Sequence, residues 1–70
     1  MIIDEKYVHT KVELENLFNK LSRNGFIWSN SELLSYRPNF DLPVYIHLYN
    51  DKRITWCTHS IPQSYWEYYL

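Results

Sequence analysis

The chain has 70 residues and a formal charge of −1, from seven basic and eight acidic side chains, which excludes the basic footprint of a nucleic-acid-binding protein. A single cysteine excludes an internal disulfide, and no apolar run approaches the roughly 20 residues that span a bilayer. We expect residues 1–70 to form one domain. The amino-terminal residues lack the charged and apolar regions of a signal peptide, so we expect a cytoplasmic protein.

Aromatic residues make up 19% of the chain, as three Trp, seven Tyr and three Phe. A domain of this size buries only about 60% of the surface that its unfolded chain exposes, whereas each ring can bury roughly 150–250 Å². Thirteen rings exceed what so small a core can enclose. We therefore expect some rings on the surface, where tyrosine and tryptophan often serve interfaces.

Residues 11–24 carry the signals of one amphipathic helix. Thr10 is a natural N-cap, and Glu13 can reach back to the N–H of the cap to form a capping box. Gly25 lies where a helix-terminating residue needs a positive φ. Apolar side chains recur at the spacing of one helix face, at Leu14, Leu17, Phe18 and Leu21.

Three further segments predict a small sheet. Residues 26–28 form a short strand directly after the helix, and residues 6–9 form another strand before it. Residues 44–49 and 53–58 flank the turn residues 50–52 and predict an antiparallel hairpin. In that hairpin the aliphatic side chains Val44, Ile46 and Leu48 share one face, and Tyr45, His47 and Tyr49 share the other.

Two segments have no sustained period. Residues 29–43 predict an irregular loop of a length that often carries function. Residues 61–69 are compatible with a short helix, with Ser60 and Gln63 as a second capping box, or with a strand. The fold class that follows is α+β, with one amphipathic helix packed on a small, mostly antiparallel sheet of three to four strands and an aromatic C-terminal tail.

Cysteine and histidine offer the first candidates for chemistry. Cys57 and His59 are two residues apart, with His47 on the partner strand and His9 near the N-terminus. A thiolate and imidazoles suit zinc, but no second ligand pair with a familiar spacing accompanies them. A thiolate nucleophile would need an activating and orienting environment, and none is evident around Cys57. We therefore predict no enzyme, no catalytic residue, no metal and no cofactor.

Carboxylates and glycine offer no further site. We expect Asp4 and Glu5 to be solvated, and Glu13 and Glu15 suit the positive end of the helix dipole. The single glycine, Gly25, already has a structural role, so no phosphate-binding loop can form.

The thirteen aromatic side chains are the one feature that these structural roles do not explain. Either the tail covers the tyrosine face and buries every ring, or an exposed patch binds a protein partner or a second copy of the chain. A base-stacking platform ranks lower because a basic groove is lacking. The candidate partner-binding residues are Tyr36, Arg37, Tyr45, His47, Tyr49, Tyr65, Trp66, Tyr68 and Tyr69.

The order of motifs over residues 8–58 is also informative. The leucine-bearing helix is followed by Gly25-Phe26-x-Trp28-Ser29, then by Ile46-x-Leu48-Tyr49 and Arg53-Ile54-Thr55-Trp56. This arrangement resembles small accessory proteins of tailed bacteriophages and prophages. The resemblance implies a protein made inside an infected bacterium that binds a host protein or blunts a host defence.

Two functional hypotheses follow from the sequence. The first is a non-enzymatic, phage-type protein that occludes a host enzyme or defence component through the aromatic patch and the 29–43 loop. The second is an oligomeric protein that binds or sequesters a nucleotide, using Arg37, His47, Tyr45 and the tail. A homodimer fits both, because a symmetric interface would relieve a marginal core and a surplus of rings.

Overall fold

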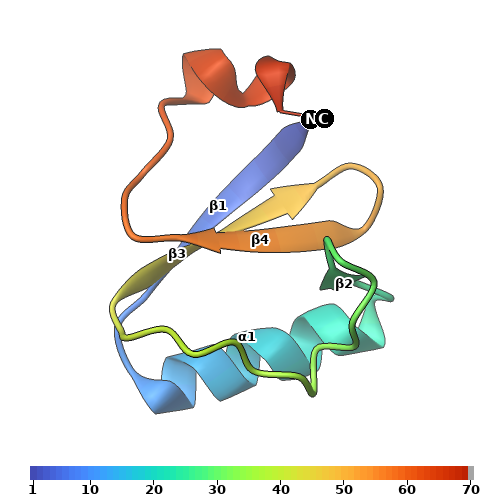
Figure 1. Ribbon diagram of the computed structural model, residues 1–70, viewed down its shortest axis with the longest axis vertical. Helices are drawn as coiled ribbons and strands as arrows, with labels where there is room; N and C mark the ends of the chain where they lie inside the picture. Colours follow the sequence, from blue (N-terminus) through green and yellow to red (C-terminus); the bar gives the residue numbers. More distant parts are fainter. Residues whose placement is uncertain (70) are drawn as a thin grey trace.

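The computed structural model describes residues 1–69, and it has one long helix and four strands (Figure 1). The elements in chain order are β1 (Ile2–Val8), α1 (Lys11–Arg23), β2 (Ile27–Trp28), β3 (Val44–Tyr49), β4 (Arg53–Cys57) and the 3₁₀-helix η1 (Gln63–Tyr68). The α+β class predicted from the sequence is confirmed. No helix within residues 1–69 combines the length and the apolar character needed to cross a membrane.

The four strands form one sheet in the order β1-β3-β4-β2. The pairs β1–β3 and β3–β4 are antiparallel, and β2 runs parallel to β4 over only two residue pairs. The strand predicted at residues 6–9 begins earlier, because the pairing of β1 with β3 continues to Ile2 opposite Tyr49. Helix α1 lies across one face of this sheet (Figure 1).

Helix α1 begins and ends at the predicted signals. The Thr10 hydroxyl accepts a hydrogen bond from the Glu13 N–H at 3.2 Å, and the Glu13 carboxylate binds the same hydroxyl rather than the backbone N–H of the cap. At the other end, Gly25 has φ +82°, and the Phe26 N–H donates to the Leu21 carbonyl at 3.0 Å. This last bond belongs to a Schellman motif, which satisfies carbonyls that the helix leaves unpaired.

The core lies between α1 and the aliphatic face of the sheet. Its buried members are Val8, Leu14, Phe18, Leu21, Trp28, Leu34, Val44, Ile46, Leu48 and Ile54. Leu34 comes from the 29–43 loop, so the loop is tied to the core at one point. The Trp28 indole N–H donates to the Tyr36 carbonyl at 2.9 Å and ties the loop at a second point.

The tail forms the helix η1 and not a strand. The predicted capping box at its start is wrong, because no side chain caps η1. The Ser60 hydroxyl instead donates to the Glu5 carboxylate at 2.8 Å. Helix η1 contacts β1 and lies beside the N-terminal end of that strand (Figure 1).

Candidate functional site

The excess of aromatic rings over core space is confirmed. Six of the thirteen rings are exposed, and only Phe18 and Trp28 are buried. The exposed rings belong to Tyr7, Tyr36, Trp56, Tyr65, Tyr68 and Tyr69. They come from β1, the 29–43 loop, β4 and the tail, so they do not arise from one segment.

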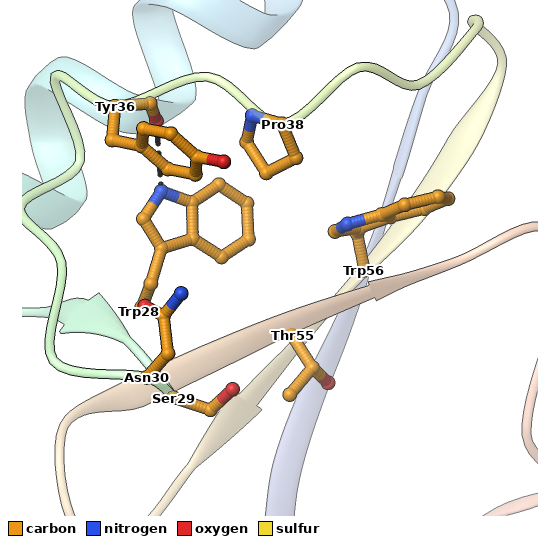
Figure 2. Close-up of a pocket in the computed structure, with 7 residues that line it drawn as sticks. All are labelled: Trp28, Ser29, Asn30, Tyr36, Pro38, Thr55 and Trp56. Carbon is orange, nitrogen blue, oxygen red and sulfur yellow. Dashed lines mark hydrogen bonds between the residues drawn. The ribbon is translucent and has the colours of Figure 1, made fainter.

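Two of the exposed rings line a pocket between the 29–43 loop and β4, which we call the loop–β4 pocket. It has a volume of about 290 Å³. Its lining residues are Trp28, Ser29, Asn30, Tyr36, Pro38, Thr55 and Trp56. Figure 2 shows the indoles of Trp28 and Trp56 on opposite sides of the pocket, with Pro38 of the loop between them.

Core packing fixes one wall of the loop–β4 pocket. Trp28 is 4% exposed and meets the Phe18 ring edge-on, with the ring centroids 5.4 Å apart. Its indole N–H is already bonded to the Tyr36 carbonyl (Figure 2). The wall therefore offers a rigid apolar surface and not a hydrogen-bond donor.

The opposite wall is more accessible. Trp56 lies opposite Ile46 in the β3–β4 pairing and therefore shares the aliphatic face. It is nevertheless 37% exposed, and its ring packs against Phe40 of the loop at 5.0 Å between centroids. Tyr36, at 49% exposure, adds a third ring at the rim. A partner would meet these two rings first.

The floor of the pocket is the point where β2 leaves β4. The Ser29 N–H donates to the Ile54 carbonyl at 3.0 Å, which is the last backbone bond between the two segments. Beyond this bond, the Arg53 guanidinium donates to the Ser29 carbonyl at 3.2 Å. The Ser31 N–H donates to the Trp28 carbonyl at 2.9 Å and not to β4. The parallel ladder of β2 and β4 therefore ends at Ser29 and does not reach Trp56.

Both arginines near the loop are engaged. Arg53 also donates to the Ser31 hydroxyl at 3.1 Å. Arg37 pairs with Glu15 at 3.0 Å and lies 4.5 Å from the centroid of the Phe18 ring. Among the described residues, no charged side chain lines the loop–β4 pocket. Its chemistry is aromatic, with hydroxyl and amide groups at the edge.

A second cluster lies on the other face of the sheet. His47 is 1% exposed, and its Nε2 lies 2.8 Å from the Glu5 carboxylate. The same carboxylate accepts from the Ser60 hydroxyl at 2.8 Å and from the Ile61 N–H at 2.9 Å. The His47 Nδ1 is buried and has no hydrogen-bond partner among the described residues. Glu5 thus joins β1, β3 and the tail.

Opposing effects set the pKa of Glu5. Burial raises the pKa of this carboxyl, but the hydrogen bonds from Ile61, Ser60 and His47, together with the charge of His47, outweigh burial and lower it below the ordinary value of 4.5. The carboxylate form is therefore favoured in the folded protein. This cluster acts as a clasp between the tail and the sheet.

The predicted partner-binding residues differ in their accessibility. His47 is buried by its pairing with Glu5, so a partner cannot touch it. Tyr45 is half-buried against Tyr7, with 4.6 Å between the ring centroids. Tyr49 is half-buried, and its hydroxyl lies 3.4 Å from that of Thr55.

The predicted residues of the loop and the tail are more accessible. In the loop, Tyr36 lines the pocket, whereas Arg37 is tied to Glu15. In the tail, three tyrosines are exposed and one tryptophan is half-buried: Tyr65, Tyr68, Tyr69 and Trp66. No ring contact within residues 1–69 joins these tail rings to Tyr45 or Tyr49.

Sequence reasoning missed two important residues. Trp56 shares a strand face with the buried Ile54, yet its indole is partly open to solvent and lines the pocket. Glu5 was assigned to solvent because it lies in an acidic N-terminus, yet its pairing partner in β3 is His47. The alternation of β3 does place His47 opposite the aliphatic face, but the register of β1 against β3 cannot be read from the sequence.

The cysteine lies beside one histidine. The Cys57 Sγ lies 3.6 Å from the His59 Nδ1. Within residues 1–69, no group of three or more His, Cys, Asp or Glu side chains is placed to hold a metal ion. No protein-family model, curated protein or solved structure matches the chain.

Proposed function

We propose that this chain is a small, non-enzymatic binding protein of bacteriophage or prophage type, which acts in the bacterial cytoplasm. It docks the exposed aromatic side chains beside the 29–43 loop, together with that loop, onto a host protein and occludes that protein's working surface. The observation that carries this proposal is the loop–β4 pocket, whose open wall is Trp56 and whose rim is Tyr36.

The chemistry of the pocket supports a protein partner. Tryptophan and tyrosine are enriched among the residues that dominate binding energy at interfaces. The Trp56 ring packs against Phe40, and the buried Trp28 holds the backbone of Tyr36 in place, so less conformational entropy would be lost when a partner binds. The uncharged lining also matches the depletion of charge at the centres of such interfaces.

The nucleotide-binding alternative draws less support from the same geometry. A volume of about 290 Å³ lies at the lower limit of small-ligand pockets, which span about 300–1,000 Å³. The two arginines nearest the loop, Arg37 and Arg53, are bonded to Glu15 and to loop oxygens. A phosphate group would have to displace these bonds.

The experiment is capture of a partner from a bacterial lysate by the tagged chain and by two variants. Trp56→Ala removes the open wall of the pocket, and Tyr68→Ser removes a ring that is 72% exposed on η1. We expect a stoichiometric partner with the unmodified chain and with Tyr68→Ser, and loss of that partner with Trp56→Ala. Equal capture by all three proteins, or no stoichiometric partner at all, would contradict the proposal.

We also propose that two copies of the chain associate as a homodimer. A second copy would cover rings that one copy leaves open, and small domains gain stability when they associate. Sedimentation of the purified chain over a range of concentrations measures this directly. A single monomeric species at every concentration would remove the homodimer from the proposal.

A further inference from the structure

We infer that the partner contributes an extended peptide segment, which pairs with the backbone of Trp56 as an added strand and places one uncharged, apolar side chain in the loop–β4 pocket. This inference rests on the proposed function and names the chemistry of the partner at that site. It follows from the backbone groups of β4, from the way β2 ends, and from the lining of the pocket.

The direction of the β4 backbone groups is set by the β2 pairing. The carbonyls of Lys52 and Ile54 accept from the N–H groups of Ile27 and Ser29, so they face β2. Backbone groups of alternate residues in a strand face the same neighbour. The N–H and C=O of Trp56 therefore face the same side as those of Ile54, away from β3.

The groups that would continue the ladder to Trp56 are both occupied elsewhere. In a parallel pair, the next rung would join the Trp56 N–H to the Ser29 carbonyl and the Trp56 carbonyl to the Ser31 N–H. Arg53 holds the Ser29 carbonyl, and the Ser31 N–H is bonded to the Trp28 carbonyl. No backbone group of residues 1–69 takes their place.

A turn at Ser31 ends the pairing of β2 with β4. Ser31 has φ +74°, a left-handed conformation that turns the chain away from β4. The Arg53 side chain bonds both the carbonyl before this turn and the Ser31 hydroxyl. The short strand β2 thus stops at a fixed place, and the following stretch of β4 keeps an open edge.

The pocket supplies the second half of the recognition. Trp28 and Trp56 stand on the same face of neighbouring strands, and the loop–β4 pocket lies between them (Figure 2). A residue paired beside Trp56 would direct its side chain to that face and into the pocket. Because no lining residue is charged, the complementary side chain is uncharged, and about 290 Å³ admits one large apolar group.

The other free edge of the sheet is not equivalent. The pairing of β1 with β3 is irregular between Ile2 and Asp4, and on the outer side of β1 the Asp4 carboxylate accepts from the Glu5 N–H at 2.8 Å. Irregular pairing and charged residues are devices that protect edge strands from unwanted pairing. The pairing of β4 with β3 is regular through Cys57, no side chain within residues 1–69 hydrogen-bonds the Trp56 backbone, and this edge adjoins an aromatic pocket.

Main-chain pairing with side-chain pockets is a recurring way to recognise extended peptides. The test begins with a displayed library of random octapeptides, selected against the full chain. We expect selected peptides to alternate in polarity around one large apolar residue. On titration into ¹⁵N-labelled protein, they should shift the Trp56 backbone amide signal and slow its hydrogen exchange.

Two methylated copies of a selected peptide provide the matched control. Methyl groups on the backbone nitrogens that face β4 block pairing and should weaken binding by at least about tenfold, since a hydrogen bond is lost and a clash is added. Methyl groups on the alternate nitrogens face away and should leave the affinity nearly unchanged. Equal affinity of the two copies would overturn the inference.

Other outcomes would also overturn it and are separable from the proposed function. If the library yields no peptide while Trp56-dependent capture of a host protein succeeds, the partner binds as a folded surface, and only the strand inference fails. If the exchange of the Trp56 amide slows with protein concentration in the absence of peptide, the occupant is a second copy of the chain.

Discussion

Replacement of Glu5 by alanine is expected to destabilise the fold by about 3 kcal/mol, which is large for an acidic residue of an edge strand. The Glu5 carboxylate accepts hydrogen bonds from Ser60 and Ile61 and pairs with the buried His47. Removing the carboxylate leaves the buried His47 ring and the donors of Ser60 and Ile61 without their partner, and each buried group left without a hydrogen bond costs about 1–3 kcal/mol. Glu5 keeps 18% of its side-chain exposure, so water can replace part of the lost interaction, and we place the cost at about 2–4 kcal/mol.

This loss matters because the whole domain is small. At about 0.05–0.15 kcal/mol per residue, a chain of 70 residues has roughly 4–10 kcal/mol of stability. Urea unfolding followed by tryptophan fluorescence and by far-ultraviolet circular dichroism measures the change. Ser60→Ala, which removes one donor, should cost about 1 kcal/mol.

Glu32→Ala is the matched control, because Glu32 is an exposed acidic residue of the loop. Its expected effect is within about 0.5 kcal/mol of zero. If Glu5→Ala unfolds at the same urea concentration as Glu32→Ala, then the clasp between β1, β3 and the tail does not contribute to stability, and our reading of this cluster is refuted.

Further predictions concern pH, the helix ends and the binding surface. Because folding lowers the pKa of Glu5, its contribution is complete above the ordinary value of 4.5 and is lost as the pH falls through the folded value. Urea melts should therefore show the difference between the unmodified chain and Glu5→Gln shrinking below about pH 4.5. Gly25→Ala should cost about 1 kcal/mol, from its positive φ alone, since open space surrounds the position; an unchanged melting temperature would contradict this. Thr10→Ala should also cost about 1 kcal/mol by loss of the cap, whereas Thr10→Ser should retain most of the stability. Tyr36→Ser should leave the urea midpoint nearly unchanged and weaken partner capture, and undiminished capture would remove Tyr36 from the interface.

The local structure was predictable where short-range chemistry decides it. The ends of α1 follow from Thr10 and Gly25, which are residues with few competing roles at those positions. The hairpin β3–β4 follows from strict alternation and a turn of three residues. In each case the relevant partners lie within a few residues along the chain, so the sequence pattern contains the whole interaction.

The site was only partly predictable because distant segments build it. The loop–β4 pocket depends on a turn at Ser31 and on the reach of Arg53 across 24 residues to Ser29. The clasp depends on Glu5 meeting His47 and Ser60, which are 42 and 55 residues away. No local pattern in the sequence reports either of these long-range contacts. The same long-range bond explains the failed capping box, because Ser60 is bound to Glu5 and is not available to η1.

The two free edges of the sheet, at β1 and at the Trp56 end of β4, differ in how well they could pair with another strand. On the β1 side, the carboxylate of Asp4 occupies the Glu5 amide, and the displaced backbone near Ile2 breaks the straight line that a neighbour would need. The inferred addition of a strand would therefore be confined to the β4 side. One peptide strand beside Trp56 would occupy this one site, which favours a one-to-one complex over open-ended stacking of copies of the chain.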